Sequence, residues 1–122
     1  MWPSKWIRDD VEIQALLERW RGTRLEVWEY SCSHARLLIR LIREKENMDP
    51  VASAYLFCHG CQSVRFDDGW RGMDVHIKRA SGSSGSACVV TDRDRLHVVC
   101  RGVSAVETAV IPFINLNDQL RG

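Results

Sequence analysis

The chain has 122 residues, of which 45 % are hydrophobic and 27 % charged, and its formal net charge is +1. This length and hydrophobic content fit one domain with its own core and exclude a disordered chain. The near-neutral charge gives no general attraction for nucleic acid or anionic membranes, so we expect neither as a partner. Arginine dominates the cations, with fourteen Arg against three Lys, and such an excess without clustering along the sequence is typical of codon bias.

The compartment is predicted from the first residues and from the cysteines. The first ten residues contain no apolar run of signal-peptide length, and no segment approaches the roughly 20 apolar residues of a membrane helix. The five cysteines are an odd count and stand among apolar residues, as buried free thiols do: Cys32, Cys58, Cys61, Cys88 and Cys100. We therefore expect a protein of the reducing cytoplasm.

Residues 10–21 are predicted to form an amphipathic helix, preceded by an N-terminal arm over residues 1–9. Asp9 is a suitable N-cap, because Glu12 follows it at capping-box spacing. Four apolar residues at helical spacing share one face: Ile13, Leu16, Leu17 and Trp20. Gly22 then suits the end of the helix.

Residues 24–111 are predicted to be mainly β, beginning with a hairpin of residues 25–31 and 36–42. The first strand places two large apolar residues on each face, Leu25 and Val27 on one and Trp28 and Tyr30 on the other. A second helix over residues 34–46 is the alternative, because Leu, Arg and Glu are good helix formers. The alternation of apolar residues favours the strand.

Further strands are predicted from alternation and turn signals. The candidates are residues 54–58, 61–66, 73–78, 87–91, 96–101 and 103–111, of which 87–91 and 96–101 form a second hairpin. Residues 81–86, Ser-Gly-Ser-Ser-Gly-Ser, are expected to be a flexible loop. The predicted fold is one α+β domain, a helix packed on an antiparallel sheet of about six to eight short strands, curled toward a sandwich or a partly open barrel.

The motif Cys58-His59-Gly60-Cys61 is the sharpest chemical signal in the sequence. Two cysteines at this spacing can hold one corner of a zinc site, and Cys88 and Cys100 are the remaining thiol candidates if they face each other across the second hairpin. The pair could also act as a redox dithiol, but no helix begins after Cys61 to lower a thiol pKa. The third interpretation is that both cysteines are buried core residues on either side of a His-Gly turn and have no chemical role.

Other polar residues give weaker signals of catalysis. Ser33 and His34 lie in the expected first turn, where a nucleophile and a base seldom reach one substrate atom. Asp92 and Asp94 are expected to form a hairpin turn rather than a catalytic carboxylate pair. Because the established catalytic motifs are also missing from the sequence, we lean against an enzyme.

Five tryptophans supply the candidates for a docking surface. Trp20 and Trp28 are expected in the core. The candidates for partner binding are Trp2 and Trp6 in the arm and Trp70 with Arg71 in a loop, because exposed Trp beside Arg is typical of interface hot spots.

Residues 30–40, Tyr-Ser-Cys-Ser-His-Ala-Arg-Leu-Leu-Ile-Arg, resemble a segment of small uncharacterised bacterial proteins. Those proteins carry an aromatic residue followed by x-x-Ser-His-Ser-x-Leu-x-Ile/Leu-Arg, and here Ala35 stands in place of the second serine. The match covers about a tenth of the chain. The resemblance implies a small cytoplasmic α+β domain that contains the first hairpin, and it brings no activity.

Together these patterns predict a non-enzymatic protein-binding module, an immunity-type or accessory protein that binds another protein or itself. The alternative is a metal-binding or dithiol redox domain that uses Cys58 and Cys61.

Overall fold

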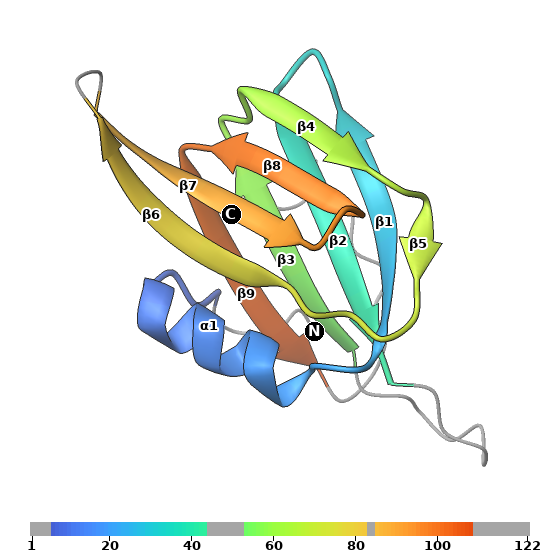
Figure 1. The fold of residues 1–122 in the computed structure, drawn as a ribbon. Helices are drawn as coiled ribbons and strands as arrows, with labels where there is room; N and C mark the ends of the chain where they lie inside the picture. The colour runs from blue at the N-terminus through green and yellow to red at the C-terminus, as the bar shows by residue number, and fades with distance from the viewer. Residues whose placement is uncertain (1–5, 44–52, 83–84, 109–122) are drawn as a thin grey trace.

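A computed structural model describes residues 6–43, 53–82 and 85–108, which contain one helix and nine strands (Figure 1). In chain order they are α1 (Asp10–Arg19), β1 (Arg24–Ser31), β2 (Arg36–Ile42), β3 (Ser53–His59), β4 (Ser63–Phe66), β5 (Gly69–Trp70), β6 (His76–Gly82), β7 (Gly85–Asp92), β8 (Leu96–Cys100) and β9 (Gly102–Thr108). The predicted α+β class is confirmed.

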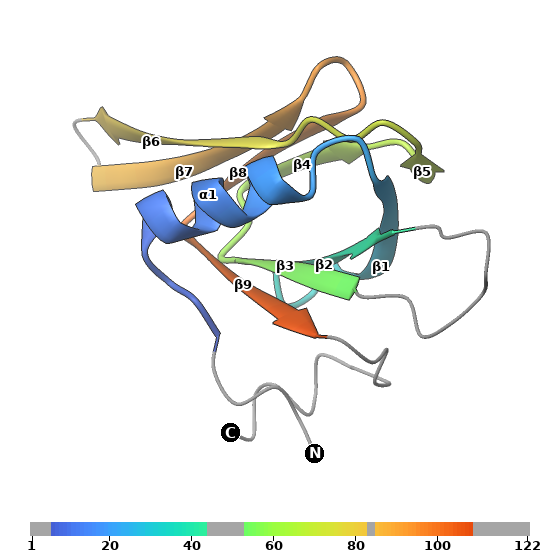
Figure 2. The same ribbon diagram turned by 90° about the horizontal axis from the view of Figure 1, so that it is seen from below.

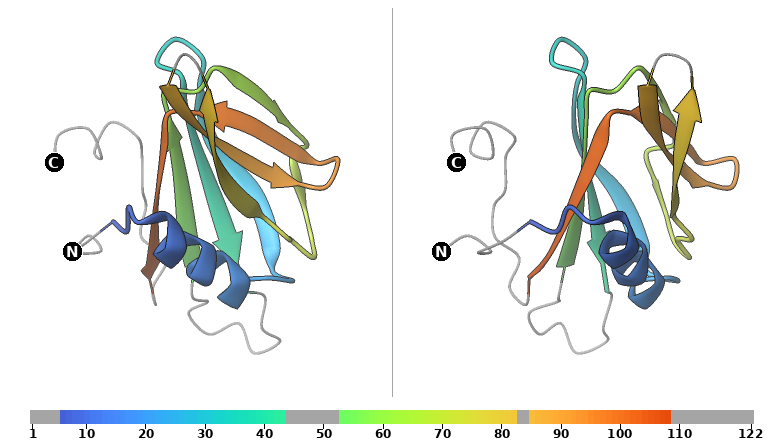
Figure 3. Two further views of the ribbon diagram at one scale, coloured as in Figure 1. Left: turned by 60° about the vertical axis from the view of Figure 1, so that its left-hand side comes forward. Right: turned by 90° about the vertical axis from the view of Figure 1, so that its left-hand side faces the viewer.

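The strands form two antiparallel sheets that face each other. Sheet A has the order β5-β1-β2-β3-β9, and sheet B has the order β4-β8-β7-β6. Figures 2 and 3 show the sheets as two layers, with α1 along the open side where it contacts β6 of one sheet and β9 of the other. The expected curled sandwich is therefore observed. Its strands number nine among the described residues because the chain at Gly69 and Trp70, expected to be a loop, pairs with β1 as the short β5.

Local signals account for both ends of α1. The side chain of Asp9 accepts a hydrogen bond from the backbone N–H of Glu12 at 3.1 Å, as the N-cap prediction requires. The helix ends at Arg19 with Trp20 as its C-cap, and Gly22 follows at φ +87°, a conformation that favours glycine. The predicted apolar face is buried, with Ile13, Leu16, Leu17 and Trp20 each at most 1 % exposed.

The first hairpin is confirmed over the described residues, because β1 and β2 pair from Arg24↔Ile42 to Ser31↔Arg36. A β-bulge between Val27 and Glu29 makes the expected orientation of Trp28 and Tyr30 wrong. The extra residue shifts the alternation of the strand, so these two side chains no longer share a face. Trp28 packs on the outer side of sheet A, where the guanidinium of Arg40 lies 4.7 Å from its ring, whereas Tyr30 contacts Phe66 of sheet B.

The main core fills the space between the sheets and under α1, and it contains most of the buried apolar side chains, Cys58, Cys88 and Cys100 among them. A smaller cluster of Leu38, Tyr55 and Val106 lies on the other face of sheet A. Sheet A therefore buries apolar side chains on both faces. This explains why β2 and β3 read as nearly continuous apolar runs.

The second predicted hairpin is confirmed as β7 and β8, with Cys88 directly opposite Cys100. The pairing of β6 with β7 continues as far as Gly82↔Gly85, so the ends of the expected 81–86 loop belong to strands. Residues 83 and 84 lie outside the described residues, as do the arm before Trp6 and the chain after Thr108.

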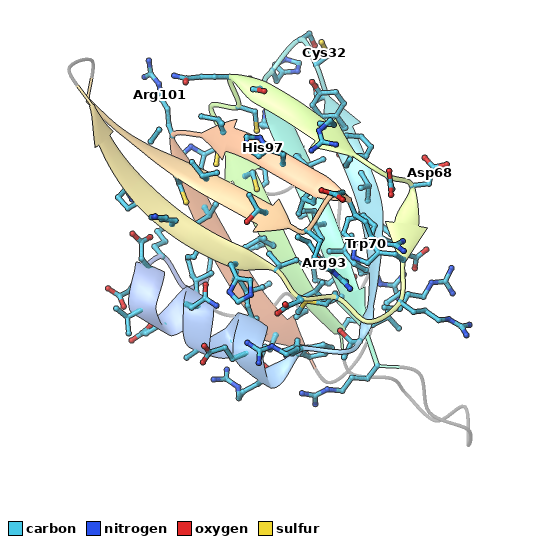
Figure 4. The ribbon with its side chains drawn as sticks, viewed as in Figure 1. Cys32, Asp68, Trp70, Arg93, His97 and Arg101 are labelled. Atoms are coloured by element: carbon cyan, nitrogen blue, oxygen red, sulfur yellow. The ribbon has the colours of Figure 1, made fainter. Side chains whose placement is uncertain are left out.

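A buried carboxylate fixes the turns at one end of the sandwich. Asp92 is 0 % exposed, and its Oδ2 accepts hydrogen bonds from Trp70 Nε1 at 2.7 Å and from the Asp74 N–H at 2.9 Å. Its Oδ1 accepts from Arg93 Nε at 2.8 Å, and Arg93 also donates to the carbonyl of Gly72. Figure 4 shows Trp70 and Arg93 close together at this end of the sandwich. Asp92 lies at the hairpin turn, as expected. It also ties β5 and residues 72–74 to the β7–β8 hairpin.

Candidate functional sites

Four of the five thiols lie together between the sheets. Cys58 is at the end of β3, and Cys61 follows it after Gly60, whose φ of +63° makes the turn. Cys88 and Cys100 face them from sheet B and stand opposite each other across the hairpin, a register that the sequence left open. The fifth, Cys32, is exposed at the β1–β2 turn, at the top of Figure 4.

The surroundings of Cys61, Cys88 and Cys100 hold these three thiols in the protonated form. A hydrogen bond with the Cys100 thiol and burial raise the pKa of Cys88, and a hydrogen bond with Cys58 raises the pKa of Cys100 against an opposing contribution from Cys88. Burial raises the pKa of Cys61 to about 11. Because the thiolate is the nucleophile and the metal ligand, this environment favours packing over dithiol chemistry.

A metal site among these residues was expected only as an alternative. Within residues 6–43, 53–82 and 85–108, no group of three or more His, Cys, Asp or Glu side chains has an arrangement that could hold a metal ion. Cys61 instead donates its S–H to the carbonyl of Cys58 at 3.6 Å, and Cys100 donates to the carbonyl of Cys88 at 3.6 Å.

The first turn brings hydroxyl groups to a histidine. Ser31 Oγ lies 2.9 Å and Ser33 Oγ 3.2 Å from Nδ1 of His34, and all three residues belong to or flank the exposed turn between β1 and β2. These short contacts within one turn are the local hydrogen bonds that Ser commonly makes there.

The aromatic docking candidates differ in their accessibility. Trp70 is only 4 % exposed, with its indole N–H bound to Asp92, so it offers little surface to a partner. Trp6 is half-buried and packs edge-on against Phe57 with 6.3 Å between ring centroids. Trp2 lies outside the described residues. Arg71 is exposed, and it lines the arginine-rich hollow described below.

Five arginines line one hollow of about 370 Å³, which we call the arginine pocket. Its lining residues are Arg19, Arg21, Gly22, Thr23, Arg24, Arg43 and Arg71, and none of these is acidic. The pocket lies where α1 ends and β1 begins, beside the end of β2 and the turn after β5.

Backbone contacts explain why residues so far apart in sequence meet there. The N–H of Gly22 donates to the carbonyl of Met73 at 2.8 Å, and the N–H of Met73 donates to the carbonyl of Thr23 at 2.9 Å. This pair of bonds holds the turn after α1 against the segment that carries Arg71. The Arg24↔Ile42 pairing places Arg43 at the same end of sheet A.

Several of the arginines are anchored from outside the pocket lining. Arg19 Nη2 lies 2.6 Å from Oε1 of Glu107, and Arg21 Nε lies 3.1 Å from Oδ1 of Asp74. The guanidinium of Arg43 stacks 4.1 Å above the ring of Trp20. These contacts limit the rotamers of long side chains that would otherwise lose conformational entropy when a ligand binds.

No local pattern in the sequence predicts this pocket. The sequence carries the signal, an excess of Arg over Lys, but the five residues are spread from position 19 to position 71. Of the five, only Arg71 was a site candidate. The clustering becomes visible only when the sheet register and the loop contacts are known.

Comparisons with known proteins give no match to a family model, to a curated protein or to a solved structure. Within the described part of the chain, no helix has both the length and the apolar character needed to cross a bilayer.

Proposed function

We propose that this protein is a non-enzymatic binding module that docks a negatively charged segment of another protein in the arginine pocket. The observation that carries the proposal is that five arginine residues line one hollow, with no acidic side chain among its described lining residues. Arg presents a planar fork of N–H donors that matches oxyanions, and Arg clusters are a recurring means of recognising acidic or phosphorylated motifs.

The anchoring of the pocket supports binding rather than general surface charge. An exposed arginine that is held by one carboxylate oxygen still has most of its five N–H donors for other contacts. Arg19 and Arg21 are held in this way, with side chains 53 % and 56 % exposed. A partly fixed and still accessible cation loses less entropy on binding than a free one.

The free cysteines support the reducing cytoplasm as the compartment of such a module, and the resemblance of residues 30–40 supports a bacterial source. The alternative function, metal or redox chemistry at Cys58 and Cys61, has weaker support because burial raises the pKa of Cys61 to about 11.

The test is an NMR titration of the arginine side-chain Nε–H signals with a short synthetic peptide rich in glutamate, at about 50 mM salt where screening is modest. We expect shifts for Arg19, Arg21, Arg24, Arg43 and Arg71, and weaker binding as salt increases. Arg65, on β4, is the internal control, because its guanidinium donates to the carbonyl of Asp94 in another part of the molecule. Equal shifts at Arg65, or none in the pocket, would contradict the proposal.

A further inference from the structure

We propose that the group bound in the arginine pocket is a phosphoryl group on a protein segment that also carries a nearby basic residue. This inference rests on the proposed function and adds the chemical class of the ligand. Three observations support it: the all-arginine composition of the cationic lining, the anchoring of its guanidinium groups, and the charge of the adjacent hollow.

The composition of the pocket favours a phosphoryl group over a carboxylate. Among its described lining residues, the charged ones are five arginines, with no lysine and no acid. A phosphorylated side chain carries a charge of about −1.5 to −2 at neutral pH and three acceptor oxygens, so it can engage more guanidinium groups than a carboxylate. A volume of about 370 Å³ accommodates such a group together with part of the residue that carries it.

The anchoring holds arginines that belong to different elements around the pocket. Arg43 donates through Nη2 to the carbonyl of Arg19 at 3.1 Å while its plane rests on Trp20. Arg21 contacts Asp74 through Nε, and its two terminal nitrogens, Nη1 and Nη2, take no part in that contact. Arginines that are anchored on separate elements around one hollow suit a ligand with oxygens pointing in several directions, as the tetrahedral phosphoryl group has.

The adjacent hollow distinguishes a protein segment from a nucleic acid. It has a volume of about 480 Å³ and shares Arg24 and Arg71 with the arginine pocket, but it also contains the carboxylates of Glu26 and Asp68. Figure 4 shows Asp68 pointing outward at this side of the molecule. A nucleic-acid strand carries a phosphate at every nucleotide, so its next phosphate would meet these carboxylates. A protein segment with one phosphoryl group and a neighbouring basic residue complements both hollows.

The test compares three labelled synthetic peptides of one sequence by fluorescence anisotropy. They carry phosphoserine, serine or glutamate at one position, with arginine two residues away. We expect the phosphoserine peptide to bind at least about tenfold more tightly than the glutamate peptide, and the serine peptide to bind weakest. Replacing the neighbouring arginine of the phosphopeptide by glutamate should weaken binding several-fold, because Glu26 and Asp68 then repel it.

Variants locate the site. Arg21→Gln and Arg71→Gln should each weaken phosphopeptide binding at least about fivefold, while the matched variant Arg65→Gln leaves it unchanged. Circular dichroism checks that each variant is folded, and the two pocket variants serve as independent tests if one is destabilised.

The outcomes separate this inference from the proposed function. If glutamate and phosphoserine peptides bind equally well in the pocket, the phosphoryl inference is overturned and the proposed function stands. If no peptide binds, both fail. If a single-stranded oligonucleotide of equal charge competes better than the phosphopeptide, or if Arg65→Gln weakens binding as much as Arg21→Gln, the inferred site or ligand class is wrong.

Discussion

The indole Nε1 of Trp20 donates a hydrogen bond to Oε2 of Glu107 at 2.6 Å, and this contact joins the end of α1 to β9. The same carboxylate accepts a bond from Arg19 through its other oxygen. One glutamate therefore fixes the helix on sheet A and also one wall of the arginine pocket, which couples the stability of the fold to the geometry of the candidate site.

Replacing Glu107 by Gln should lower the free energy of unfolding by about 1 kcal/mol. The amide oxygen can still accept from Trp20, but the charge that holds Arg19 is lost. Urea denaturation measures the change, and Glu18→Gln on the exposed face of α1 is the matched control. Equal losses for both variants would show that the contact does not hold the helix.

Replacing Asp92 by Asn should destabilise the protein by about 2–4 kcal/mol, because it removes a buried charge that accepts three hydrogen bonds. The fluorescence of Trp70 should also change, since its indole N–H loses a charged acceptor. Asp94→Asn, in the same hairpin turn but exposed, should have little effect on either measurement.

Acid should destabilise the fold through the same two carboxylates. Burial raises the pKa of Asp92, but hydrogen bonds from Asp74, Arg93 and Trp70 outweigh it, so the pKa ends below its ordinary value of 3.8. The pKa of Glu107 likewise ends below 4.5, because the bonds from Trp20 and Arg19 outweigh burial.

A group with a lowered pKa in the folded state stabilises the fold above its unfolded pKa, and this contribution is lost as pH falls through the folded value. Urea denaturation should therefore show a steady free energy of unfolding from about pH 7 to pH 5 and a decline below it. The double variant Asp92→Asn with Glu107→Gln should decline less steeply. A decline of the same slope would assign the acid sensitivity to other groups.

Thiol labelling should separate Cys32 from the other cysteines. Cys32 is exposed, Cys58, Cys88 and Cys100 are buried, and burial raises the pKa of Cys61 to about 11. With iodoacetamide at pH 7.5, mass spectrometry should find one rapid modification in the native protein and five in urea. Rapid modification of Cys61 in the folded protein would support the redox alternative instead.

Inorganic phosphate should raise the melting temperature if the arginine pocket binds it, because a ligand of the folded state stabilises that state. Thermal scans at equal ionic strength should show a larger increase with phosphate than with acetate, and Arg71→Gln should remove the difference. A difference that persists in this variant would place phosphate binding elsewhere.

Local patterns in the sequence were sufficient for much of the fold. Helical spacing and the Asp9 cap predicted α1, and alternation predicted the hairpins of β1 with β2 and of β7 with β8. These features depend on neighbours a few residues apart, so the sequence alone determines them. The bulge at Trp28 could not be predicted, because one inserted residue changes the alternation without a distinct sequence signal.

Tertiary structure alone decided the candidate site. The arginine pocket combines residues from the end of α1, the start of β1, the end of β2 and the turn after β5, which meet through sheet register and the bonds between the Gly22 turn and Met73. The sequence determined that the chain is rich in arginine and folds as helix and sheet. The positions of the charges relative to one another follow from long-range pairing, which no local pattern encodes.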